Sequence, residues 1–170
     1  MSRPHYILLP VSPLFIGISM TGAFLLNLLP WGHFIGAPDF VALVLVFWGI
    51  HQPRKVGIGL AFFMGLLMDV HEATLLGENA LAYTLLSYFA IMIHRRVLWF
   101  PVLTQAIHVF PLLLMTQAIQ VVVRYIVSGK FPGWLHFIES AVAIALWPVV
   151  TWLLLAPQRR AVDRDHTRPI

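Results

Sequence analysis

Hydrophobic residues fall into six runs along the chain, and short segments containing polar residues, glycine or proline separate them. The runs occupy residues 12–29, 40–50, 56–70, 80–93, 98–127 and 134–156. A helix needs about 20 apolar residues to cross the hydrocarbon core of a bilayer, and several runs approach or exceed that length. The second and third runs are shorter, and we expect them to form a tight hairpin. The pattern predicts an all-α, polytopic membrane protein with six transmembrane helices.

Composition supports this class of protein. The chain is 59% hydrophobic and only 11% charged, whereas soluble domains are usually about 25% charged. Because so few polar residues leave no room for a sizeable soluble domain, we expect one six-helix membrane domain over residues 1–156. Residues 157–170 are polar, and we expect a disordered cytoplasmic tail. The absence of cysteine excludes disulfides and thiolate chemistry.

Charges are distributed unevenly among the segments that connect the runs. With a cytoplasmic amino terminus and six crossings, nine of the eleven cations fall on the cytoplasmic side: Arg3, Arg54, Lys55, Arg95, Arg96, Arg159, Arg160, Arg164 and Arg168. Most acids fall on the other side, namely Asp39, Asp69, Glu72, Glu78 and Glu139. The cation bias follows the positive-inside rule and predicts that both termini are cytoplasmic. Basic clusters placed between apolar runs do not indicate nucleic-acid binding.

The segment around residues 62–83 carries the densest group of acids next to apolar helix. Gly57, Ala61 and Gly65 follow one another at four-residue spacing in the third run, and Asp69 continues that row. Small residues at this spacing allow another helix to approach closely. Glu72 stays on the same side if the helix continues. The row is consistent with simple packing that ends in interfacial acids, or with a functional intramembrane acid.

The fourth run begins with polar residues that follow Gly77. Glu78 lies where a helix dipole favours an anion, and Asn79, Tyr83 and Ser87 form a polar stripe at four-residue spacing. In lipid such groups seek partners on a neighbouring helix. We expect Asp69 to reach Asn79 or Tyr83 and to hold the third and fourth helices together. Asp69→Asn should keep these hydrogen bonds and therefore preserve function. A ligand site is the alternative.

A second polar row lies in the fifth run. Gln117, Gln120 and Arg124 share a helical face, and Glu139 opens the sixth run at a similar depth, so an Arg124–Glu139 pair is plausible. The eight histidines are scattered, and HExxH and GxSxG motifs are absent. We therefore expect no metal, no cofactor and no catalytic site.

Two short segments resemble a known family. The sequence G-L-L-M-D-V, followed by L-L-G-E-N-A-L-A-Y, contains Gly65, Asp69, Leu76, Gly77 and Ala80 in an arrangement similar to the bacterial rod shape-determining protein MreD family. The resemblance implies a non-enzymatic scaffold in the inner membrane that serves the lateral-wall elongation machinery. It implies an MreC-like bitopic membrane protein as partner, with the elongation transpeptidase and its multispanning glycosyltransferase partner reached indirectly. The cationic tail fits contact with membrane lipid.

The same resemblance suggests a fold and an alternative function. MreD-like chains are similar to the substrate-binding subunits of energy-coupling-factor transporters, so the protein could be a small-molecule-binding subunit of a vitamin-type transporter. The acidic turn from Asp69 to Glu78 would then close a ligand pocket. The short outer loops favour the scaffold.

Overall fold

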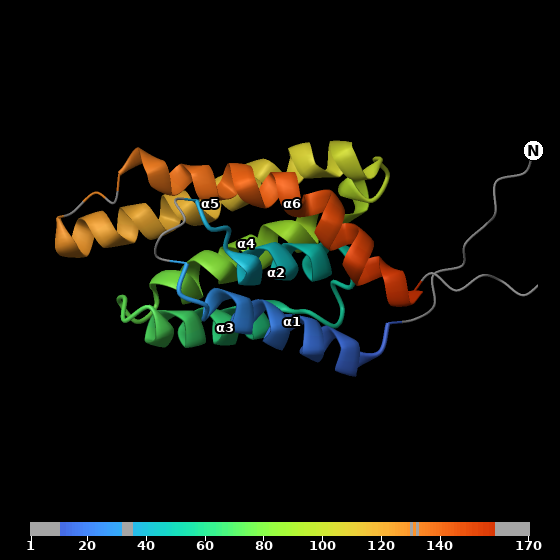
Figure 1. Ribbon diagram of the computed structural model, residues 1–170, viewed down its shortest axis with the longest axis horizontal. Coiled ribbons are helices and arrows are strands. Elements are labelled where there is room, and N and C mark those ends of the chain that lie inside the picture. Colours follow the sequence, from blue (N-terminus) through green and yellow to red (C-terminus); the bar gives the residue numbers. More distant parts are fainter. Residues whose placement is uncertain (1–10, 32–35, 130, 132, 159–170) are drawn as a thin grey trace, which may run out of the picture.

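The computed structural model describes residues 11–31, 36–129, 131 and 133–158. These residues form six α-helices and two short 3-10 helices, without a strand. The elements are α1 (Pro13–Asn27), α2 (Phe40–His51), α3 (Ile58–His71), α4 (Glu78–Val97), α5 (Val102–Ser128), η1 (Trp134–Phe137), α6 (Ile138–Leu155) and η2 (Ala156–Gln158). The helices run up and down along the long axis of the molecule (Figure 1). The all-α prediction is confirmed.

Helix α2 forms the centre of the bundle. Every residue from 41 to 50 is buried, because the helix is apolar on all sides and packs on α1, α4, α5 and α6. A helix that is hydrophobic all round belongs in such a position. The Trp48 indole donates to Ser19 Oγ at 2.8 Å and joins α2 to α1. The expected tight hairpin of the second and third runs is wrong, because α3 packs mainly on α4 and hardly contacts α2.

The α3–α4 pair is packed closely at one glycine. A Cβ atom at Gly65 would lie 2.3 Å from Ala80 Cα and 2.5 Å from Ala80 N. Ala61 is fully buried, whereas a Cβ at Gly57 would meet open space. The small-residue row therefore supports helix packing at Gly65, as the four-residue spacing suggests.

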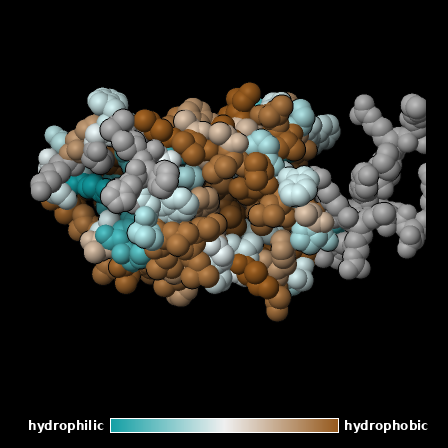
Figure 2. Space-filling view, in the orientation of Figure 1, coloured by the Kyte–Doolittle hydropathy of each residue, from teal (hydrophilic) through white to brown (hydrophobic). Residues whose placement is uncertain are grey.

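Helix lengths in the structure support a membrane protein, but they support fewer membrane-spanning helices than the six predicted from the sequence. Among the described helices, α5 and the segment Ile138–Gln158 are long and apolar enough to cross a bilayer. Helices α1, α2 and α3 have 15, 12 and 14 residues, and α4 carries charged groups at both ends. Apolar side chains cover the middle of the visible face, and the most hydrophilic residues gather at one end (Figure 2). Exposed large hydrophobics are found on α1, α3, α4, α5 and α6.

Apart from Arg124, which pairs with Glu78 at the acidic end, the described acids and the described lysines and arginines separate along the bundle axis. Asp39, Asp69, Glu72, Glu78 and Glu139 all lie at the end where α2, α4 and α6 begin. Arg54, Lys55, Arg95 and Arg96 lie near the opposite end, in the α2–α3 link and the last turn of α4. Residues 159–170 of the predicted tail are outside the described residues, and residues 156–158 before them form η2.

Candidate functional site

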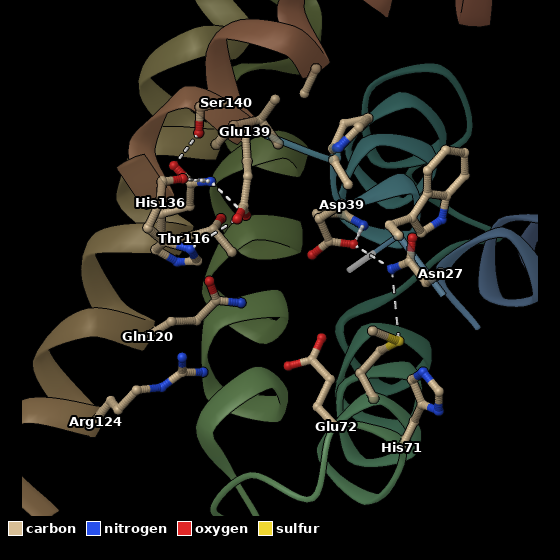
Figure 3. A pocket seen from close by; sticks show the side chains of 18 residues that line it. Asn27, Asp39, His71, Glu72, Thr116, Gln120, Arg124, His136, Glu139 and Ser140 are labelled. Atoms are coloured by element: carbon tan, nitrogen blue, oxygen red, sulfur yellow. Dashed lines mark hydrogen bonds and ion pairs between the residues drawn. The ribbon is translucent and has the colours of Figure 1, made fainter. Parts of the chain in front are cut away.

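A polar pocket opens at the acidic end of the bundle. Its volume is about 210 Å³, and its lining comes from the ends of α1 and α3, the beginnings of α2 and α6, η1, and the second half of α5. Figure 3 shows polar side chains from these elements facing a common space. The alternation of helix directions explains this convergence, because it brings three helix starts and three helix ends to one side of the molecule.

Asp39 is the first of three carboxylates in the pocket. As the N-cap of α2 it accepts from the backbone N–H of Ala42 at 3.0 Å, an arrangement typical of helix starts. It also accepts from Asn27 Nδ2 at 2.9 Å and from the hydroxyl of Tyr83. Burial raises the pKa of the Asp39 carboxyl, while these hydrogen bonds favour its ionised form. Asp39 thus connects α1, α2 and α4.

Glu139 is the second carboxylate and lies in the first turn of α6. It accepts from Gln117 Nε2 at 3.3 Å and lies 3.1 Å from His136 Nδ1. Ser140 donates to Gln117 Oε1 at 2.5 Å, which fixes the orientation of the Gln117 amide. These contacts tie α5 to α6.

Glu72 is the third carboxylate and is the least well held. It follows the last residue of α3, and the only described hydrogen bond of its side chain comes from Asn79 Nδ2 at 3.4 Å. Its side chain remains exposed at the pocket, yet surrounding protein atoms remove part of its hydration. This partial desolvation, assisted by the nearby negative Asp39, raises the pKa of Glu72 to about 7.

Asp69 lies beside the pocket and is buried. Its carboxylate accepts from three backbone N–H groups, those of Gly77 at 2.8 Å, Asn79 at 2.7 Å and Ala80 at 3.4 Å. The hydroxyl of Thr74 lies at 3.4 Å. Asp69 therefore satisfies free N–H groups at the start of α4 as a capping residue would, although it belongs to α3.

Glu78 is 1% exposed and pairs with Arg124 of α5. Arg124 Nη2 lies 2.6 Å from Glu78 Oε1, and Arg124 Nε donates to the same oxygen at 3.1 Å. Next to this pair, Gln120 Nε2 donates to Asn79 Oδ1 at 2.6 Å. The polar row of α5 thus faces the start of α4.

Several predicted pairings differ from the structure. The predicted Arg124–Glu139 pair does not form. Helix α4 lies beside α5, and its Glu78 pairs with the Arg124 guanidinium instead. Asp69 reaches Asn79, though through the backbone, and Tyr83 binds Asp39 instead. Gly77, with φ of +105°, makes the left-handed turn that places the Asn79 N–H at Asp69. Ser87 of the polar stripe is buried without a described partner.

Sequence reasoning missed part of the pocket. From the sequence, Asp39 counts only as one of the acids on the outer side, and Asn27 and His136 have no assigned role. The sequence feature that could have identified them is their position as polar residues near the ends of apolar runs. Within the described part of the chain, no group of three or more potential metal ligands of the His, Cys, Asp or Glu type is found.

An apolar exterior around an up-and-down helical bundle, with a polar pocket at its end, is typical of a helical membrane protein. Residues 10–156 match the family model described as rod shape-determining protein MreD. The chain is also 31% identical over 146 residues to "Rod shape-determining protein MreD" of Haemophilus influenzae, which covers 82% of this chain and 87% of that protein. The chain belongs to the MreD family. No solved structure matches it.

Family membership sets the broad role. MreD proteins are membrane proteins that determine rod shape, and the family is not known for catalysis. The comparisons lend no support to the vitamin-transporter alternative. The predicted likeness to energy-coupling-factor subunits stays a prediction.

Proposed function

We propose that the protein is a non-enzymatic scaffold of the lateral-wall elongation machinery in the inner membrane. The observation that carries this proposal is the match of residues 10–156 to the MreD family model, which covers nearly all of the helical bundle. Its partner would be an MreC-like bitopic membrane protein. Through that partner it would influence the elongation transpeptidase and its multispanning glycosyltransferase partner.

In this proposal all six helices cross the membrane and both termini are cytoplasmic. The described acids lie at one end of the bundle and the described cations other than Arg124 lie near the other end. This distribution supports that orientation, because cytoplasmic segments are enriched in Lys and Arg. Helix α2, with 12 residues, spans only about 18 Å. It is surrounded by other helices, so its short length need not match the lipid.

Exposed apolar side chains support a protein that acts through contacts in the membrane plane. Large hydrophobic residues on α1 and α3 include Leu14, Ile18, Phe62 and Phe63, each 48% or more exposed. Such surfaces contact lipid or the transmembrane helix of a partner.

The test has two parts. The tagged protein is purified by affinity from membranes of its own bacterium, and in a separate strain the protein is depleted from the cells. We expect an MreC-like protein to co-purify, and we expect depleted cells to lose their rod shape. Rod-shaped growth after complete depletion, or recovery of coupling and ATPase subunits in place of the MreC-like protein, would contradict the proposal. A tagged unrelated six-span protein of the same membrane serves as the control for non-specific capture.

A further inference from the structure

We propose that the pocket binds an organic cation with N–H donors, an alkylammonium or guanidinium group, among the carboxylates of Asp39, Glu72 and Glu139. The inference goes beyond a scaffold role and does not depend on the identity of a protein partner. It rests on the charge of the pocket, on the position of Glu72 relative to α3, and on a Gln120 oxygen in the pocket wall that has no donor among the described residues.

The charge of the pocket is not balanced by the lysine and arginine residues that line it, and the other basic lining residues are His71 and His136. Among the described lining residues, Arg124 is the only lysine or arginine. Arg124 is already engaged by Glu78, a buried carboxylate outside the lining, through two contacts to the same oxygen. Three carboxylates therefore face the space without a matching fixed cation (Figure 3).

Helix ends stabilise two of these carboxylates but not the third. Asp39 caps the start of α2 and Glu139 lies in the first turn of α6, where the helix dipole favours an anion. Glu72 caps the carboxyl end of α3, where the dipole disfavours one. Because its hydrogen bond from Asn79 is long, at 3.4 Å, Glu72 is the carboxylate that gains most from a cation.

An unused acceptor provides the independent observation. Gln120 is only 9% exposed, and its Nε2 donates to Asn79 Oδ1 at 2.6 Å. Asn79 in turn uses its Nδ2 to donate to Glu72. This direction of donation requires the Gln120 Nε2 to face Asn79, so Gln120 Oε1 is left without a donor among the described residues. Gln120 lies in the pocket wall between Glu139 and Arg124 (Figure 3).

The unused acceptor and the carboxylates both favour a ligand that is a cation with N–H donors. A carbonyl oxygen accepts N–H groups, and carboxylates pair with ammonium or guanidinium ions. A phosphate or a carboxylate ligand would meet acceptors and like charge. The pocket volume of about 210 Å³ is larger than the ~150 Å³ of a cavity that binds benzene, so one basic head group and a short chain fit.

The first experiment compares small probes on the purified full-length protein in detergent. Thermal unfolding and calorimetric titration are measured with n-butylammonium and n-butylguanidinium. The controls are n-butanol, which has the chain without charge, and tetramethylammonium, which has charge without N–H donors. We expect the first two to bind and to raise the unfolding temperature, with affinities at least tenfold above both controls. Equal effects of all four probes would overturn the proposal.

The second experiment removes the least compensated charge. Glu72→Gln keeps the side-chain size and should lower the affinity for n-butylammonium at least tenfold, whereas Glu72→Asp keeps the charge and should retain more binding. Unfolding of both variants without probe checks that they fold, which the exposed position of Glu72 favours. Unchanged affinity in a folded Glu72→Gln variant would overturn the proposal. If neither variant folds, the comparison of probes on the wild-type protein still tests it.

A third arm distinguishes a free amine from the basic side chain of a protein. A blocked pentapeptide Gly-Gly-Lys-Gly-Gly is compared with n-butylammonium and with the same peptide carrying alanine. Tighter binding of the lysine peptide supports a protein side chain, and tighter binding of n-butylammonium supports a free amine. If neither exceeds the alanine peptide, the proposal fails. Because all arms use the isolated protein, that failure would leave the co-purification test of the scaffold role unaffected.

Discussion

Asp69 shows how a single carboxylate is accommodated next to apolar helix. Both of its oxygens are occupied by donors from the turn and first residues of α4: Oδ1 faces Asn79 N and Thr74 Oγ1, and Oδ2 faces Gly77 N and Ala80 N. An unpaired carboxylate near hydrocarbon costs on the order of 2–3 kcal/mol or more. The backbone donors remove this cost and also satisfy the start of α4.

This geometry changes what is expected of asparagine at position 69. The sequence suggested that Asp69→Asn would keep the hydrogen bonds, but an amide has one acceptor oxygen and would turn its NH₂ toward backbone N–H groups. We expect Asp69→Asn to lower the free energy of unfolding by about 1–3 kcal/mol, and Asp69→Leu to lower it more. Chemical or thermal unfolding in detergent measures both. Wild-type stability of the leucine variant would contradict the capping role.

The raised pKa of Glu72 predicts that the stability of the protein depends on pH. This pKa is raised from 4.5 to about 7, first by partial desolvation and then by Asp39. The folded state thus binds a proton more tightly than the unfolded chain, so this contribution to stability is fully present below pH 4.5 and is lost as pH rises through about 7. The charged or titratable groups around it are Asp39, Arg124, Glu78, His71, His136 and Glu139.

We therefore expect the unfolding temperature to fall between pH 5 and pH 8 in the wild-type protein. In Glu72→Gln this fall should be smaller, because glutamine cannot ionise. Thermal unfolding at pH 5, 6, 7 and 8 in both proteins provides the measurement. The same pH dependence in both would show that another group is responsible.

At the level of helices, the α3–α4 pair depends on a glycine, and the bundle depends on a central helix whose only strongly polar residue is the terminal His51. Gly65 lets the backbone of α3 approach that of Ala80 more closely than any side chain would allow. Helix α2 lies in the centre because each of its faces can be covered by another helix. The position of α4 beside α2, α3 and α5 then decides which polar groups meet.

Substitution at Gly65 tests the close approach. Gly65→Ala would place Cβ 2.3 Å from Ala80 Cα, so the helices must separate, and we expect a loss of about 1–3 kcal/mol in the free energy of unfolding. Gly59→Ala in the same helix is the matched control, since its Cβ would meet nothing within 4 Å and alanine favours helix. Equal stability of the two variants would mean that α3 does not pack on α4 as described.

For the whole molecule, the separation of charges along the bundle axis predicts membrane orientation. The pocket should open on the outer side, and the α2–α3 link and the end of α4 should face the cytoplasm. A phosphatase reporter fused after Lys130 should be active, and one fused after Arg96 should be inactive. The reverse pattern would contradict the six-span model with cytoplasmic termini.

The amino-acid sequence alone was sufficient for the class of protein, the order of six helices and the MreD resemblance. These features depend on local properties, namely the lengths of apolar runs, the residues between them and a short motif around Gly65 and Asp69. It also indicated which end of the bundle is acidic, because the charges lie in the segments that bound the runs.

Only the tertiary structure decided which polar groups meet. Arg124 pairs with Glu78 across 46 positions, and Tyr83 pairs with Asp39 across 44. Such contacts depend on which helices are neighbours, and apolar runs of similar character do not specify this. The central position of α2 has the same cause: a uniformly hydrophobic helix has no preferred face in sequence, and its burial is determined by the helices that surround it.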